Sequence, residues 1–186
     1  MRQVTAKPAL KTENMNKPVI SIIGKSNVGK TTLIEKMLPV FSEKGYNIGT
    51  IKHHLHDYDS DIRGKDSWRH QNAGARQTMI SSPEKLSFFS KLNAEMSIDD
   101  LVLYFDQSDI VITDGYKKGS KPKIEVFRPS HYGATIAEAG DNLIAYATDA
   151  PQHDFSLKVP VLDLNDPRGV AEFILRYFKL PEKKEK

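Results

Sequence analysis

The segment PVISIIGKSNVGKTTLIEK, residues 18–36, limits the possible folds of this chain more than any other part of its sequence. It joins a short apolar run, a loop bordered by Gly24 and Gly29, and a stretch whose apolar residues return at helical spacing. The loop fits the pattern G-x-x-x-x-G-K-[ST], in which backbone N–H groups surround phosphate oxygens at the start of a helix. The segment therefore predicts a buried strand, a phosphate-binding loop and a helix, in that order.

Each residue type in this loop has an expected task. We expect Lys30 to reach the outer phosphates of a nucleotide and the hydroxyl of Thr31 to hold Mg²⁺. A chance match in a glycine loop is the alternative, and the strand before and helix after it argue against that reading. The predicted nucleotide-binding residues here are Gly24, Lys25, Ser26, Asn27, Val28, Gly29, Lys30, Thr31 and Thr32.

Apolar runs alternate with helical patterns along the rest of the chain. Residues 46–53, 109–115, 123–128, 142–149 and 159–165 predict strands, residues 97–105 and 166–178 helices, and residues 66–91 a short helix followed by two strands. Such alternation implies parallel pairing through right-handed crossovers. The predicted fold class is α/β, a P-loop NTPase three-layer fold with a mainly parallel sheet and a protruding β-hairpin.

Composition limits the class of protein and its surroundings. The chain has 39% hydrophobic residues, no cysteine and no run of about 18 apolar residues, so neither a membrane span nor a thiolate metal site is expected. A net charge of +3 with scattered Lys and Arg argues against a nucleic-acid partner. We expect a cytoplasmic protein with a disordered extension at residues 1–16, one nucleotide-binding domain at residues 17–180 and a charged tail at residues 181–186.

The strand DIVITDG supplies the second acidic group that a P-loop protein needs. Asp114 ends this apolar run, so it is expected at the sheet edge as a ligand of magnesium and, with Lys30, as a catalytic residue. An ordinary turn aspartate before glycine is the alternative. Spacing does not identify the base: the guanine signature Asn-Lys-x-Asp is absent, and Asp149 is either its substitute or a polar strand end.

A loop rich in histidine and aspartate follows the second predicted strand. It contains His53, His54, His56 and His70 together with Asp57, Asp59, Asp61 and Asp66. P-loop proteins keep segments that sense the outer phosphate in this position. A transition-metal site is one reading, and a polar loop that contacts nucleotide, magnesium or substrate is the other.

Four stretches together resemble the molybdopterin-guanine dinucleotide biosynthesis protein B (MobB) family. They are GKSNVGKTTLIEK, GTIKHHLHDYDSDIRGKDSWRHQNAGA, DIVITDGYKKGSKPKIEVFR and PVLDLNDPRGVAEFI, spanning residues 18–178. The resemblance implies a GTP-binding protein with slow Mg²⁺-dependent hydrolysis, which assists the guanylyltransferase that joins GMP to molybdopterin. It also implies a homodimer, and molybdopterin itself is a candidate ligand.

The resemblance assigns further residues to loop contacts with nucleotide or substrate. These are His53, His56, Asp57, Asp61, Gly64, Lys65, Asp66, Ser67 and Lys117. The family's strand-end motif usually reads Glu-Gly-Phe-Lys, whereas this chain has Asp114, Gly115, Tyr116 and Lys117. For the dimer, the segment KPKIEVFR, residues 121–128, follows a turn and is expected to extend beyond the body and to pair with another chain.

Two rival functions use the same phosphate loop. A P-loop kinase would normally add an arginine-bearing lid, for which Arg63, Arg69 and Arg76 are the candidates. A nucleotide-gated adaptor without significant turnover would act through a protein contact instead.

Overall fold

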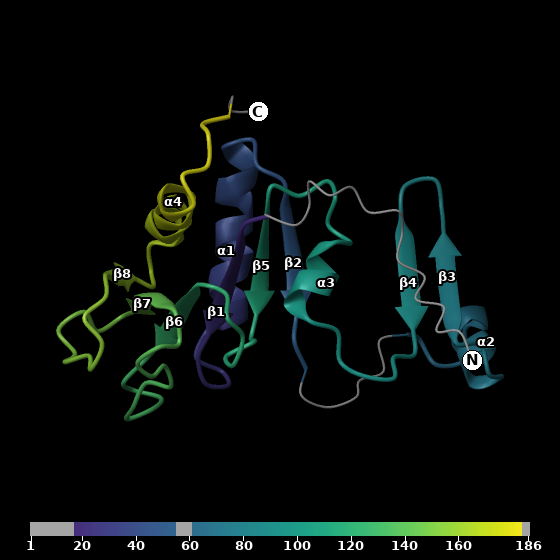
Figure 1. Ribbon diagram of the computed structural model, residues 1–186, viewed down its shortest axis with the longest axis horizontal. Helices are drawn as coiled ribbons and strands as arrows, with labels where there is room; N and C mark the ends of the chain where they lie inside the picture. Colours follow the sequence, from purple (N-terminus) through teal and green to yellow (C-terminus); the bar gives the residue numbers. More distant parts are fainter. Residues whose placement is uncertain (1–16, 55–60, 184–186) are drawn as a thin grey trace. The chain divides into compact units, whose positions relative to one another are not determined.

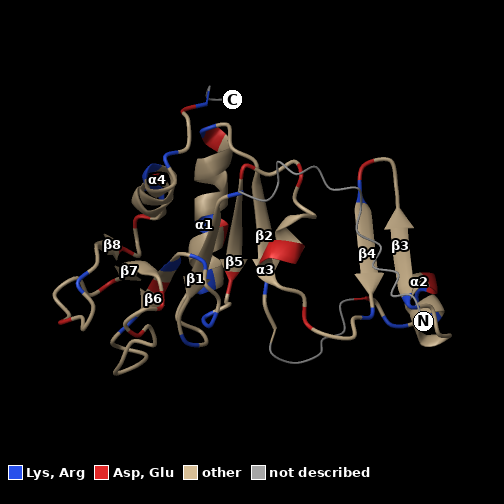
Figure 2. Cartoon of the chain, in the orientation of Figure 1, with Lys and Arg blue, Asp and Glu red and all other residues tan. Residues whose placement is uncertain are grey.

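The computed structural model describes residues 17–54 and 61–183, which belong to two compact units (Figure 1). The sheet unit runs to His53 and resumes at Ile98, and the hairpin unit comprises the described residues between them. None of the helices in these ranges is long and apolar enough to cross a membrane. Figure 2 shows that acidic and basic residues are spread over most of the coloured elements.

The sheet unit is built on six parallel strands in the order β2-β5-β1-β6-β7-β8. The strands are β1 (Val19–Ile23), β2 (Ile48–Lys52), β5 (Ile110–Asp114), β6 (Lys123–Phe127), β7 (Leu143–Thr148) and β8 (Val161–Asp163). Each falls inside an apolar run from which a strand was expected. The α/β class with a mainly parallel sheet is confirmed.

Helices cover both faces of this sheet. On one face Ile20 and Ile112 pack with residues of α1 (Lys30–Glu43) and α4 (Pro167–Tyr177) in the main core. On the other face Val19 and Val111 pack against α3 (Ile98–Val102). Because both faces are covered, β1 and β5 are buried along their whole length, which explains their nearly continuous apolar sequences.

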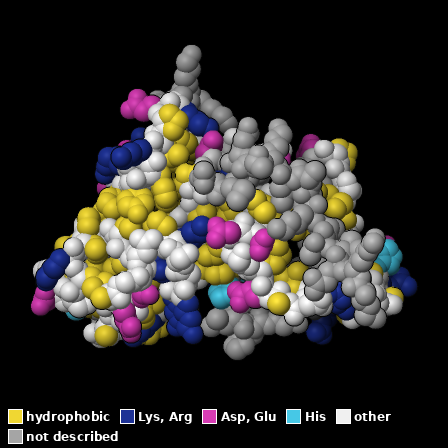
Figure 3. Space-filling model, in the orientation of Figure 1, with side chains coloured by type: hydrophobic (Ala, Val, Ile, Leu, Met, Phe, Trp, Pro, Cys, Tyr) yellow, Lys and Arg dark blue, Asp and Glu magenta, His cyan; other side chains and the backbone are white. Residues whose placement is uncertain are grey.

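The hairpin unit contains α2 (Asp66–Asn72) and the antiparallel strands β3 (Gln77–Ser81) and β4 (Leu86–Ser90). These two strands pair with each other and with no other described strand. The hairpin exposes large hydrophobic side chains, and yellow side chains are visible at its surface in Figure 3. The exposed large hydrophobic residues of β3 and β4 are Met79, Ile80, Leu86 and Phe88. A two-stranded sheet of this kind is at best marginally stable by itself in water.

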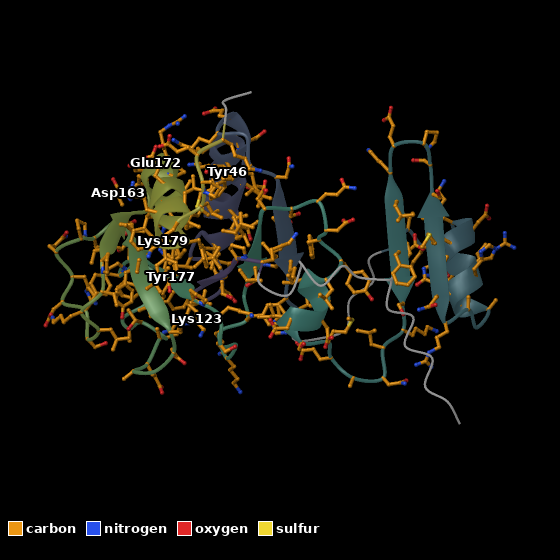
Figure 4. The ribbon with its side chains drawn as sticks, turned by 45° about the horizontal axis from the view of Figure 1, so that its top comes forward. Tyr46, Lys123, Asp163, Glu172, Tyr177 and Lys179 are labelled. Carbon is orange, nitrogen blue, oxygen red and sulfur yellow. The ribbon has the colours of Figure 1, made fainter. Side chains whose placement is uncertain are left out.

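The expectation that residues 121–128 extend beyond the body is wrong. Strand β6 lies between β1 and β7 inside the sheet, and all of its residues are buried. The two charged residues of this strand have partners inside the protein. The Nζ of Lys123, labelled in Figure 4, donates to the carbonyl oxygens of Gly119 (2.5 Å) and Asp141, and Glu125 accepts two backbone N–H groups.

Candidate functional site

The phosphate loop connects β1 to α1 through two glycines with positive φ. A Cβ on Gly24 would lie 2.4 Å from the carbonyl oxygen of Val126, and its φ of +141° disfavours any other residue. Gly29 precedes α1 in the left-handed conformation, so the helix begins at Lys30 with its first N–H groups directed into the loop. The strand, loop and helix order predicted by the motif is therefore present.

Lys30 is directed back into the loop. Its Nζ donates to the carbonyl oxygens of Gly24 (3.1 Å) and Lys25 (2.7 Å). Burial lowers the pKa of Lys30, and nearby Lys52 lowers this pKa further, whereas Asp114 opposes the shift. A phosphate stabilises the charged form of a partly desolvated lysine more than it stabilises that of a fully solvated one.

Asp114 lies beside the phosphate loop at the end of β5, with its side chain 8% exposed. Its Oδ2 accepts a hydrogen bond from the hydroxyl of Thr31 (2.7 Å) and pairs with the Nζ of Lys52 (2.5 Å). Its Oδ1 is buried and has no hydrogen-bond partner among the described residues. A buried carboxylate oxygen with spare acceptor capacity next to a threonine hydroxyl fits a hard divalent cation such as Mg²⁺.

An open pocket of about 440 Å³ lies beside the phosphate loop. Its lining residues are Ser26, Asn27, Gly29, Lys30, Thr31, Thr32 and Lys52. The pocket lies beyond the carboxyl ends of parallel strands, which is where such sheets bind their ligands. Its volume is in the range of known sites for small molecules and cofactors.

The segment that follows β6, residues 128–132, contacts the phosphate loop. Arg128 donates from Nε to the carbonyl oxygen of Val28 (3.2 Å). The hydroxyl of Tyr132 donates to the backbone carbonyl oxygen of Ser26 (2.8 Å). The ammonium of Lys25 lies 4.9 Å from the centre of the Tyr132 ring. The segment thus holds the loop through two of its backbone carbonyl groups and one of its side chains.

Asp149 follows β7 at the same edge of the sheet. Its carboxylate forms an ion pair with Arg128, and both side chains are 28% exposed. Arg128 therefore bridges the phosphate loop and the residue expected to contact the base.

The first residue of the histidine-rich loop also lies at this edge. The backbone N–H of His53 donates to the carbonyl oxygen of Asp114 (3.1 Å), and its ring stacks on Tyr116 with centroids 4.2 Å apart. Lys117 is exposed one residue further on. Tyr116 therefore makes an aromatic contact at the strand end.

The other residues of the loop that are described belong to the hairpin unit. The carboxylate of Asp61 accepts hydrogen bonds from Ser67 (3.2 Å) and Gln71 (2.8 Å), which ties the start of α2 to the segment before it. Lys65 precedes α2 without a side-chain cap, and Gly64 has a φ of +85°. Asp66 begins the helix, where it pairs with Arg69 at 3.6 Å.

The hypothesis that this loop binds a transition metal depends partly on residues that the structure does not describe. His56, Asp57 and Asp59 lie outside the described residues. Within residues 17–54 and 61–183, no group of three His, Asp or Glu side chains is arranged to hold a metal ion. Of the candidate lid arginines, Arg69 has the pairing above and Arg76 donates to Asn93 (2.6 Å).

Lys52, Arg128 and Tyr132 were not predicted from the sequence. Lys52 is the last residue of β2, and Arg128 directly follows β6. Both positions are carboxyl ends of parallel strands, so the rule that located Asp114 applies to them as well. Tyr132 lies in a loop without regular structure, and no sequence pattern points to it.

Known proteins similar to this chain include a family, sequence relatives and solved structures. Residues 19–149 match the family described as molybdopterin guanine dinucleotide synthesis protein B (MobB). The molybdopterin-guanine dinucleotide biosynthesis adapter protein of Escherichia coli K12 is 32% identical over 168 residues, which cover 87% of this chain and 94% of that protein. The crystal structure of Bacillus subtilis MobB superposes with a TM-score of 0.69 and 27% identity, covering 90% of this chain and 99% of that one.

Proposed function

The chain belongs to the MobB family, and on that premise we propose that it is a GTP-binding adapter protein of molybdopterin guanine dinucleotide biosynthesis. In this proposal it binds GTP with Mg²⁺, hydrolyses it slowly, and assists the guanylyltransferase that attaches GMP to molybdopterin. The observation that carries the proposal is that Lys30 and Thr31 line one pocket, and that the hydroxyl of Thr31 donates a hydrogen bond to the carboxylate of Asp114 at the end of β5. Its location in the cytoplasm remains a prediction from the sequence.

The phosphate loop supplies the binding of the triphosphate. The N–H groups at the start of α1 face the pocket and carry the partial positive charge of the helix terminus. Lys30 adds a cation that is already held at the loop by two carbonyl oxygens. These groups recognise phosphate whatever the base, so they explain affinity and leave base selection to other residues.

Thr31 and Asp114 are the residues that would hold Mg²⁺. When bound, the ion supplies positive charge that neutralises the charge developing on the transferred phosphoryl group. The carboxylate of Asp114 is positioned for this task by the hydroxyl of Thr31 and by its place at the end of a buried strand.

Asp149 is the proposed contact to guanine. A carboxylate accepts hydrogen bonds from the N1 and exocyclic N2 donors of guanine, which adenine does not present in the same arrangement. In this structure the carboxylate pairs with Arg128, so guanine binding would add to or replace that ion pair. Asp149→Asn should therefore reduce the preference for GTP over ATP while leaving binding of the phosphates intact.

An adapter protein acts through contact with another protein rather than through rapid turnover. A measured turnover well below the usual enzyme range of about 1 to 10³ per second would support this role, whereas rapid transfer to a small acceptor would support a kinase. We propose that the chain acts as a homodimer and that the hairpin unit takes part in the interface. The exposed apolar residues of β3 and β4 and the unshared edges of these strands suit pairing with a second copy.

Reconstitution of the guanylyl transfer tests the function. Purified chain is added to molybdopterin, GTP, Mg²⁺ and the guanylyltransferase, and the molybdopterin guanine dinucleotide formed is quantified. We expect an increase that Lys30→Ala abolishes; no increase at any ratio of the two proteins would contradict the adapter role. Sedimentation at micromolar concentration tests the dimer, which a monomer with and without GTP would exclude.

A further inference from the structure

Lys52 lies at the edge of the phosphate pocket and contacts Asp114. It ends β2 directly opposite Asp114 in the parallel pairing of β2 with β5. Its Nζ lies 2.5 Å from Asp114 Oδ2, the same oxygen that accepts the hydrogen bond of Thr31. Its side chain is 50% exposed and lines the pocket together with Lys30 and Thr31.

The charges around the pocket explain why a cation is needed there. Asp114 is an acidic group next to a site that we propose to bind a triphosphate, and like charges at short range repel each other. Lys30 lies in the same pocket, but its Nζ is engaged by the carbonyl oxygens of Gly24 and Lys25. The cation in contact with the Asp114 carboxylate is that of Lys52.

We propose that the ammonium group of Lys52 is a built-in counter-cation for Asp114, which keeps the pocket receptive to a nucleoside triphosphate until a divalent cation takes over the carboxylate. This inference rests on the proposed function. It assigns to Lys52 a positioning role: the lysine acts on the phosphates through the charge of Asp114.

The exposure of Lys52 suits replacement by a metal ion. Ion pairs with a solvent-exposed partner contribute little free energy, so releasing Lys52 from Asp114 costs little. The lysine side chain can remain in water on its flexible stem when the pair opens. A deeply buried lysine at this position would instead compete strongly with the divalent cation.

The test compares GTP affinity with and without the metal. Isothermal titration with GTP is carried out at equal ionic strength in EDTA and in excess Mg²⁺, for the wild type and Lys52→Ala. We expect Lys52→Ala to weaken metal-free binding about tenfold and binding with Mg²⁺ less than about threefold, because the metal then compensates Asp114. Lys36→Ala, an exposed lysine of α1, is the control and should change neither value.

Two further variants separate a charge effect from a structural one. Lys52→Arg keeps the cation and should restore most of the metal-free affinity. In an Asp114→Asn background the effect of Lys52→Ala in EDTA should shrink to about threefold or less, since the charge to be compensated is gone. An unchanged effect in that background would contradict coupling between the two residues.

Other outcomes overturn the inference in distinguishable ways. Equal losses in EDTA and Mg²⁺ would make Lys52 a direct phosphate contact, and no loss in EDTA would make it a solvent-facing lysine. In both cases the wild type still binds GTP and the proposed function stands. If the wild type binds GTP in neither buffer, the proposed function fails and this inference fails with it.

Discussion

Substitution of Lys30 and of Asp114 should separate nucleotide binding from hydrolysis. In the proposed function Lys30 contributes its charge to the triphosphate in both the ground state and the transition state, so Lys30→Ala should weaken GTP binding. Because Lys30 is partly desolvated and held in place by Gly24 and Lys25, we expect a loss of about 2–4 kcal/mol, the cost typical of removing one partner of a desolvated charge pair. That loss corresponds to a rise of about 30-fold to 1,000-fold in Kd.

Asp114→Asn should behave differently. The substitution removes the ion pair with Lys52, but that lysine is half exposed and the loss of stability should stay below about 1 kcal/mol. GTP affinity in Mg²⁺ should remain within about tenfold of the wild type, whereas hydrolysis should fall by at least about 100-fold because the amide is a poorer ligand for the hard cation.

Titration calorimetry and phosphate release, measured on the same preparations, give the two quantities independently. Thermal unfolding of each variant provides the control for loss of structure. If Asp114→Asn hydrolyses GTP at the wild-type rate, Asp114 is a turn residue without a role in catalysis. The acidic ligand would then have to be sought among Asp57, Asp59, Asp61 and Asp66.

Three further substitutions test the structure around the site. Gly24→Ala should destabilise the fold by about 2–4 kcal/mol through its contact with Val126 and its positive φ, whereas Gly133→Ala, with nothing within 4 Å, should stay within about 0.5 kcal/mol; equal values in denaturant titration would refute the close approach. Lys25→Ala should leave hydrolysis nearly unchanged, because its ammonium faces the Tyr132 ring of the same chain, and abolished hydrolysis with intact binding would contradict this. Lys123→Met should cost about 2–4 kcal/mol by leaving two carbonyl oxygens without their donor. Burial lowers the pKa of Lys123, so the unfolded chain binds more protons between that pKa and 10.5, and the stability advantage of the wild type over Lys123→Met should widen as pH rises through this window; a constant difference would refute the shift.

Much of the sheet unit follows directly from local sequence patterns. Apolar runs such as VISII and IVITD are buried on both faces and become central parallel strands. The motif with Gly24, Gly29 and Lys30 defines its own strand, loop and helix. Since Asp114 ends an apolar run, its place at the sheet edge beside Thr31 could be expected although 83 positions separate the two residues.

The features that could not be predicted depend on long-range partners of charged side chains. Lys123 and Glu125 are charged residues inside a central strand, and the carbonyl oxygen of Gly119 and the N–H group of Ile136, in the loops on either side of β6, help to make their burial possible. The bridge from Arg128 to Val28 and Asp149 joins three segments whose proximity follows from the strand order rather than from any motif. Local propensity contains no information on such contacts.

Competing titrations with GTP and ATP in the presence of Mg²⁺ test the central claim most directly. A phosphate loop is expected to recognise either triphosphate, so a difference between the two would come from recognition of the base. The account predicts that GTP binds at least about tenfold more tightly than ATP, which corresponds to about 1.4 kcal/mol from guanine contacts. Equal affinities, or a preference for ATP, would contradict the assignment of this chain as a GTP-binding adapter.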